Sequence, residues 1–293
     1  MSAIRSLFLS LLIIGSAGLL VAEEATDTMP APVLLELFTS EGCSSCPPVS
    51  DFLGQVGGKA REQNAPVYCL AWHVDYWDQL GWKDAYADPA YVKRQKRYSE
   101  TLRLRGLATP QVIMNGHQVL GGVGLRNIMD FLENGFAQPK SAIMAIEQRE
   151  PGDDAVAVTV VVKGLLNGLK LNAAVAERDL TTEVTAGENK GKTLTHHCTV
   201  RGFAAASLSQ EDIGESPAGK QAGMITVRQT IAVPLPENVD RDKTQVVVFL
   251  QDPKTMRVIA SHGVPLVAEQ TPAAGDDAPA EAEEVEEASE AAE

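Results

Sequence analysis

The chain has 293 residues, a formal net charge of −14 at pH 7 and 44% hydrophobic residues, a composition typical of folded proteins. This length allows one large domain or two small ones. No basic stripe is present, so we expect no nucleic acid partner. The four cysteines are too few for a disulfide scaffold.

The first 22 residues have the features of an export signal. Arg5 precedes an uncharged apolar run over 7–20, and Ala22 offers a small residue for cleavage. The run is shorter than the roughly 20 residues that span a bilayer. We therefore expect a cleaved signal peptide, a periplasmic or secreted location and no membrane attachment after cleavage. An uncleaved anchor is the alternative.

Two further segments are not expected to fold. Residues 23–31 form a linker, and residues 269–293 consist largely of Ala, Glu, Pro and Asp, with no aromatic or basic residue. Such a segment cannot bury enough apolar surface to offset the entropy lost on ordering. The pattern predicts a disordered acidic tail that carries much of the net charge.

Residues 32–139 show an α/β pattern. The predicted elements, in chain order, are a strand at 33–38, a helix at 49–56 that stops at Gly57-Gly58, a strand at 67–74, a helix at 90–107, a hairpin of 110–115 and 118–120 with an Asn115-Gly116 turn, and a helix at 125–136. This order predicts an α/β domain.

Residues 140–268 change character. The predicted strands lie at 143–148, 155–163, 170–178, 193–201, 224–233, 245–251 and 258–264. Short strands at roughly regular spacing, separated by Gly, Pro, Asp and Asn, predict an antiparallel sandwich-like domain. We therefore expect two separate domains that meet near residue 140.

The strongest chemical signal is the Cys43-Ser44-Ser45-Cys46 motif between a predicted strand and a predicted helix. This spacing lets two sulfurs meet, so the pair can cycle between dithiol and disulfide. Cys43 is the expected nucleophile, because a helix N-terminus stabilises the reactive thiolate, and Cys46 is the expected resolving thiol. Pro47 and Pro48 place the helix start near Cys46, although proline disfavours helical geometry at the preceding residue.

Two structural alternatives to a redox pair remain open. The cysteines can form a static disulfide, or half of a zinc site. Zinc needs two further ligands, and no second Cys-x-x-Cys or paired His motif lies nearby. His196 and His197 are adjacent on a predicted strand and face opposite ways, so they share one ion poorly. We expect no metal and no cofactor.

The Thr109-Pro110 step follows the motif and precedes the hairpin. At this position in a thioredoxin-like protein such a step is in cis and presents backbone to the substrate, so we predict a cis bond and a substrate-binding role, although X-Pro bonds are trans by default.

Several segments resemble the secreted thioredoxin-like family known as domain of unknown function 1223. They are residues 35–48, 72–78, 81–82 and 109–111 in the first half, and 187–189, 193–194 and 199–201 in the second. The resemblance implies export and a thioredoxin-like fold, while the activity of the family is itself uncharacterised. Cys69 and Cys198 depart from the family pattern.

Other side chains can serve the motif. Glu36 lies on the preceding strand, where a buried carboxylate with a raised pKa can take the proton of Cys46. His73 can stabilise the thiolate or move a proton, or it can be a structural histidine bonded to Asp75. Trp72 and Trp77 belong to an aromatic group that can form a wall for a substrate peptide, or belong to the core.

Cys69 and Cys198 are the remaining pair of cysteines. They can form a bridge between the two halves, or stay as buried free thiols.

These features predict an exported thiol–disulfide oxidoreductase-like protein that exchanges disulfides with protein thiols or a redox partner protein. One alternative is a copper-binding or delivery protein that uses Cys43, Cys46 and His73. Another is a non-catalytic envelope interaction protein whose disulfide is structural.

Overall fold

The computed structural model describes residues 32–121, 128, 142–164, 166–208 and 225–267. The predicted signal peptide, linker, acidic tail and boundary near residue 140 lie outside the described residues. So does the predicted helix at 125–136, apart from residue 128. In the part of the chain that is described, no helix is long and apolar enough to cross a membrane.

The first half opens with a strand, a helix and a strand. Strand β1 (Val33–Thr39) is buried throughout, and β2 (Val67–His73) pairs with it in parallel. Helix α1 (Pro47–Glu62) connects them. The predicted stop at Gly57-Gly58 is wrong, because α1 continues for another turn. Packing of the helix against the sheet outweighs the weak helix propensity of glycine.

The next helices cover one face of the sheet, and the next two strands form its edge. A short 3-10 helix, η1 (Asp75–Leu80), precedes α2 (Pro89–Thr101), which ends earlier than predicted. Strands β3 (Gln111–Met114) and β4 (Gln118–Leu120) form the predicted hairpin. Residues 115–117 connect the strands, and Asn115 and Gly116 both have positive φ, 47° and 71°, as the central residues of a type I′ turn closed by the bond from His117 N–H to the Met114 carbonyl require.

The second half is built almost wholly of strands. They are β5 (Ala142–Pro151), β6 (Ala155–Gly164), β7 (Lys170–Glu177), β8 (Leu180–Glu183), β9 (Thr193–His196), β10 (Thr199–Ser207), β11 (Ile225–Pro234), β12 (Thr244–Gln251) and β13 (Val258–Pro265), with a 3-10 turn η3 (Arg241–Lys243) before β12. The run predicted as one strand at 193–201 is two strands, β9 and β10, because Cys198 adopts a left-handed backbone with φ 58°.

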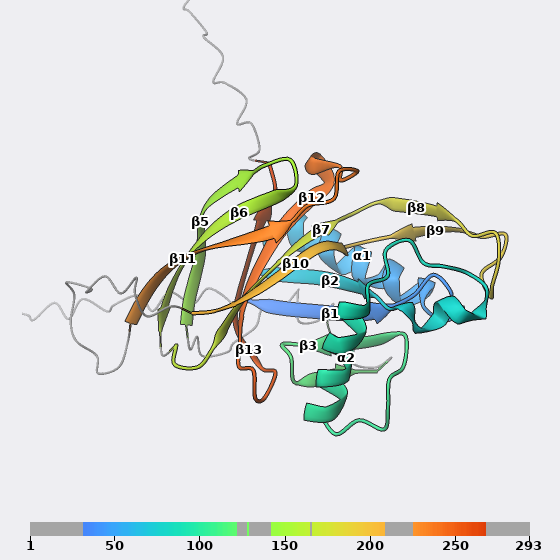
Figure 1. Ribbon diagram of the computed structural model, residues 1–293, viewed down its shortest axis with the longest axis horizontal. Coiled ribbons are helices and arrows are strands. Elements are labelled where there is room, and N and C mark those ends of the chain that lie inside the picture. The colour runs from blue at the N-terminus through green and yellow to red at the C-terminus, as the bar shows by residue number, and fades with distance from the viewer. Residues whose placement is uncertain (1–31, 122–127, 129–141, 165, 209–224, 268–293) are drawn as a thin grey trace, which may run out of the picture.

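The prediction of an α/β thioredoxin-like domain followed by a separate all-β domain is wrong. One eight-stranded sheet of order β13-β12-β7-β10-β2-β1-β3-β4 runs through both halves of the chain (Figure 1). The halves join where β10 pairs in parallel with β2, at Thr199 and Ala71. Local patterns identified most strands but carried no information about this pairing, which joins residues more than 120 positions apart.

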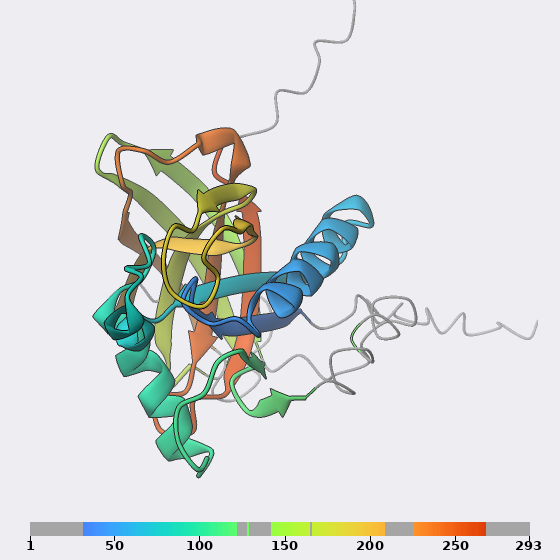
Figure 2. The same cartoon turned by 90° about the vertical axis from the view of Figure 1, so that its right-hand side faces the viewer.

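Three buried clusters organise the packing. Alternate residues of β1 face α1 (Leu35, Leu37) or α2 (Leu34, Phe38), and Figure 2 shows the two helices on opposite sides of the sheet. The third cluster lies between a three-stranded sheet, β11-β6-β5, and the end of the large sheet that contains β7, β12 and β13. The two packed sheets form a sandwich-like arrangement, but one of the two sheets is the eight-stranded sheet that also runs through the first half.

Candidate functional site

Cys43 and Cys46 are joined by a disulfide in the loop between β1 and α1. Cys46 is the N-cap residue of α1, and its carbonyl accepts hydrogen bonds from the backbone N–H groups of Val49 and Ser50. The proline pair therefore does not push the motif away from the helix, since Cys46 has helical φ and ψ and Cys43 lies one turn earlier. The sulfurs thus adjoin the positive end of the helix dipole.

Both cysteines of the motif are buried. Cys43 is 0% and Cys46 1% exposed, whereas Ser44 and Ser45 between them are exposed. A partner thiol can reach Sγ of Cys43 only after neighbouring groups move.

The loop between β8 and β9 contacts the motif from the second half of the chain. The fully buried Asn189 donates hydrogen bonds from Nδ2 to the carbonyl oxygens of Glu41, at 2.8 Å, and Cys43, at 3.0 Å. The backbone N–H of Ser44 donates to the carboxylate of Glu188 at 3.1 Å. The segment 187–189, which supported the family resemblance, therefore holds the cysteine loop in place.

Glu41, two residues before Cys43, is the centre of a buried polar cluster. Its carboxylate bonds His196 Nε2 at 2.8 Å and accepts a hydrogen bond from Trp82 Nε1 at 2.8 Å. Burial disfavours the charged carboxylate, but the bonds from His196, Thr182 and Trp82 together hold the pKa of Glu41 below its usual value. These three neighbours therefore favour the charged form of a carboxylate that burial disfavours.

Asp84 supports the same loop from the other side. Its Oδ2 accepts a hydrogen bond from the backbone N–H of Glu41 and lies 2.7 Å from Nδ1 of His73. Burial opposes ionisation, but the nearby His73 holds the pKa of Asp84 below its usual value. The partner of His73 is thus Asp84 and not Asp75. The rings of His73 and His196 meet edge to face, with centroids 5.0 Å apart.

The predicted cis peptide bond between Thr109 and Pro110 is confirmed. Trp77 connects this step to the motif loop, because its Nε1 donates to Oγ1 of Thr109 at 2.7 Å. Its side chain also packs on Gly42, where an added Cβ would lie 3.0 Å from Cβ of Trp77. Trp77 therefore lies between Thr109 and the loop that carries the cysteines, while the substrate-binding role of Thr109, Pro110 and Trp77 stays a prediction.

Glu36 lies on the α2 side of β1 and not behind the disulfide. Its carboxylate pairs with Arg94 Nε at 2.7 Å and accepts hydrogen bonds from Trp72 Nε1 and the Tyr98 hydroxyl. The ion pair makes Glu36 part of a buried polar cluster in the core. Its role as the base for Cys46 stays a prediction, and this arrangement does not support it.

Trp72 is also a core residue. It is fully buried between Tyr91 and Phe203, with ring centroids 5.0 and 5.2 Å away. A substrate wall at this position stays a prediction without structural support, whereas Trp77 is partly exposed.

Sequence reasoning missed the residues that hold the motif loop: Glu41, Trp82, Asp84, Glu188, Asn189 and His196. The proximity of Glu41 to Cys43 and the unusual His196-His197 pair were available signals. Nothing local in the sequence shows that these residues meet. In the described part of the chain, no group of three or more His, Cys, Asp or Glu side chains is placed to hold a metal ion.

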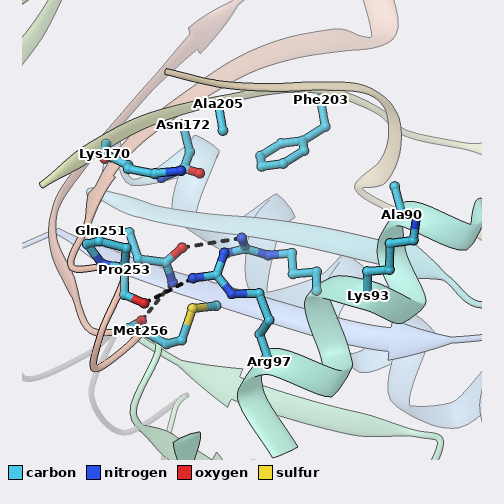
Figure 3. Close-up of a pocket in the computed structure, with 11 residues that line it drawn as sticks. Ala90, Lys93, Arg97, Lys170, Asn172, Phe203, Ala205, Gln251, Pro253 and Met256 are labelled. Atoms are coloured by element: carbon cyan, nitrogen blue, oxygen red, sulfur yellow. Dashed lines mark hydrogen bonds between the residues drawn. The ribbon is translucent and has the colours of Figure 1, made fainter. Parts of the chain in front are cut away.

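A cavity of about 170 Å³ lies apart from the cysteine motif, between α2 and the strands of the second half (Figure 3). Its wall is rich in basic side chains and contains none of the predicted site residues. The lining residues are Ala90, Lys93, Arg94, Arg97, Lys170, Asn172, Phe203, Ala205, Gln251, Pro253 and Met256. Arg94 reaches the cavity while its guanidinium stays bonded to Glu36, Tyr98 and Gln251.

Comparisons with known proteins identify a family and a fold. The sequence model of the family described as "Protein of unknown function (DUF1223)" matches residues 34–251. The structure of protein AGR_C_4864 from Agrobacterium tumefaciens is 25% identical, with a TM-score of 0.53, covering 82% of this chain and 97% of that one. HBP35 of Porphyromonas gingivalis is 19% identical, with a TM-score of 0.53 and coverage of 81% and 76%, and this likeness shows the fold alone. A comparison with curated proteins found no match.

Proposed function

We propose, from the premise that the chain belongs to the DUF1223 family, that it exchanges disulfides with protein thiols through Cys43 and Cys46. The observation that carries the proposal is the Cys43–Cys46 disulfide at the start of α1, connected through Trp77 to the Thr109-Pro110 step. The helix N-terminus stabilises the thiolate that each exchange step releases.

The reaction conserves electrons between the two partners. A thiolate of the partner attacks Sγ of Cys43, the Cys43–Cys46 bond breaks, and Cys46 leaves as a thiolate. A second partner thiol, deprotonated, then attacks the partner sulfur of the mixed disulfide and releases Cys43. The partner gains a disulfide and the chain gains two thiols. The reverse sequence reduces a partner disulfide.

Access to Cys43 depends in this proposal on the β8–β9 loop. Cys43 is fully buried, and two residues of the β8–β9 loop bond to its neighbourhood: Glu188 accepts from the Ser44 N–H, and Asn189 donates to the Cys43 carbonyl. Displacing the exposed Glu188 from the Ser44 N–H costs little, because an exposed hydrogen bond contributes little net stability, but the buried bonds of Asn189 to Glu41 and Cys43 must also break before a partner reaches Sγ of Cys43.

The decisive test is the reduction potential of the Cys43–Cys46 pair, measured by equilibration of the full chain with glutathione redox buffers. We expect a value above about −300 mV, since structural disulfides lie below that range. The protein should also accelerate reduction of insulin by dithiothreitol. Cys43→Ser should abolish the acceleration, while Cys69→Ser, remote from the motif, should retain it. A lower potential without acceleration would show a structural disulfide and overturn the proposal.

The proposal includes export to the periplasm or the exterior, where disulfides persist. It is supported by the amino-terminal sequence alone. Sequencing the mature protein from the exporting cell should give Glu23 as the first residue, and a retained Met1 with a cytoplasmic location would contradict it.

A further inference from the structure

A second pair of thiols lies beneath α1, outside the motif described above. Cys69 on β2 and Cys198 just before β10 are both free and both buried, with exposures of 1% and 3%. A Cβ added to Gly57 of α1 would lie 3.4 Å from Sγ of Cys198 and 3.8 Å from Sγ of Cys69. The two sulfurs therefore both lie beneath the same residue of α1.

The backbone turns Cys198 toward Cys69. Thr199 pairs with Ala71, whose side chain faces α1, so in a regular strand the preceding Cys198 would face the opposite side of the sheet. The left-handed φ of 58° at Cys198 breaks the alternation, and its side chain joins the buried cluster of Cys69 and Ala71. Such a backbone is costly for a residue other than glycine, and it persists only where the surroundings impose it.

The surroundings act differently on the two sulfurs. The hydrogen bond from Cys69 and the nearby Arg61 guanidinium act against burial and lower the pKa of Cys198, while the same bond raises that of Cys69. Nη1 of Arg61 lies 3.6 Å from the Cβ position of Gly57, beside both sulfurs. The thiolate is the species that attacks a disulfide.

We propose that Cys69 and Cys198 are a second disulfide-forming pair, which covalently joins β2 to β10 when a glutathione-type disulfide oxidises it. The thiolate of Cys198 attacks the oxidant R–S–S–R and releases one R–SH. Cys69 then attacks Sγ of Cys198 and releases the second R–SH, so two thiols are oxidised and one disulfide is reduced.

The pair works independently of Cys43 and Cys46. Gly57 lies eleven residues after Cys46 along α1, a separation of about 16 Å at the helical rise. Direct exchange between the two pairs is therefore impossible in the folded chain. Because both sulfurs are buried, the oxidant reaches them only while α1 is not fully packed over them.

The test uses the full chain carrying Cys43→Ser and Cys46→Ser, which leaves only this pair. The protein is refolded with oxidised and reduced glutathione, quenched with acid, and mapped by mass spectrometry without reduction. We expect a peptide that links Cys69 to Cys198. Its ratio to glutathione adducts should be at least roughly tenfold higher than in the same redox buffer with 6 M guanidinium, because folding raises the effective concentration of the two thiols.

Two readouts complete the test. The oxidised protein should unfold roughly 5–15 °C above the reduced protein, and Cys198→Ser should remove that difference. If the double variant does not fold, the same mapping on the wild-type chain gives the answer. Full alkylation of Cys69 and Cys198 after refolding with the oxidant, or linkage of either to Cys43 or Cys46, would overturn the proposal.

Discussion

Nε2 of His196 lies 2.8 Å from Oε1 of Glu41, across 155 positions of sequence. This contact joins the end of β9 to the loop that carries the cysteine motif. The motif is thus held by residues from both halves of the chain: Asp84 and Trp82 from the first, and His196 and Asn189 from the second. The second half is part of the site and does more than cover it.

Replacing Glu41 should strongly destabilise the protein. Glu41→Ala removes the acceptor for His196 and Trp82 and leaves their donors without a partner. Loss of one member of a buried pair costs about 3 kcal/mol. Urea unfolding followed by circular dichroism measures this change. Glu188→Ala is the matched control, since its carboxylate is exposed, and it should change the free energy of unfolding by less than about 1 kcal/mol. Equal changes in the free energy of unfolding for Glu41→Ala and Glu188→Ala would show that the buried bonds of Glu41 contribute no more than an exposed one.

Stability should fall on acidification through the carboxylates of the motif loop. Folding lowers the pKa of Glu41 and Asp84, so the unfolded chain binds protons at a higher pH than the folded chain. Their stabilisation is present above the usual carboxyl pKa values and is lost as pH falls below about 5 and through the folded-state values, with a slope of at most about 1.4 kcal/mol per pH unit for each group.

Urea unfolding between pH 6 and pH 3 measures this dependence. Asp84→Asn, which cannot titrate, should give a shallower decline than the wild type. An unchanged slope in the variant would assign the acid sensitivity to other groups.

Trp77 and Thr109 should be energetically coupled. Trp77→Phe and Thr109→Val each remove one partner of the hydrogen bond between η1, which packs on the motif loop at Gly42, and the cis-proline step. We expect a coupling free energy of about 1 kcal/mol from the unfolding of both single variants and the double variant. If the changes in unfolding free energy of the two single variants add up to that of the double variant, the segments that carry Trp77 and Thr109 are held independently.

Replacing two glycines of α1 by alanine should change the free energy of unfolding in opposite directions. At Gly54, an added Cβ would lie 2.5 Å from the imidazole of His197, whereas at Gly58 the nearest atom is the flexible Arg61 guanidinium at 3.9 Å. Gly58→Ala should stabilise the protein by about 0.5–1 kcal/mol through helix propensity.

Gly54→Ala should instead destabilise the protein by about 1–2 kcal/mol, because the steric clash with His197 costs more than the helix propensity of alanine contributes. Thermal or urea unfolding of the two variants gives the comparison. Stabilisation by both would show that the segment carrying His197 is free to retreat from the helix.

Sequence patterns predicted the parts that depend on neighbouring residues. The apolar run of β1, the Asn115-Gly116 turn and the cysteine spacing are local signals, and each led to the correct element. The pairing of β2 with β10 and the meeting of Glu41 with His196 depend on contacts across more than 120 residues. A single sequence contains no periodicity that reports them, so the division into two domains was wrong.

Glu36 shows a second limit. Its apolar neighbours correctly indicated burial, but burial on a strand allows either face of the sheet. The structure places it toward Arg94, away from the thiols it was expected to serve.

The continuous sheet also restricts how this chain can be divided or recombined. A fragment that ends at residue 139 would expose the edge of β2 that now meets β10, and unpaired edges of buried strands promote aggregation. The half that carries the Cys43–Cys46 motif is thus poorly suited to transplantation as an autonomous module. Gene fusions and evolutionary shuffling would have to carry both halves together.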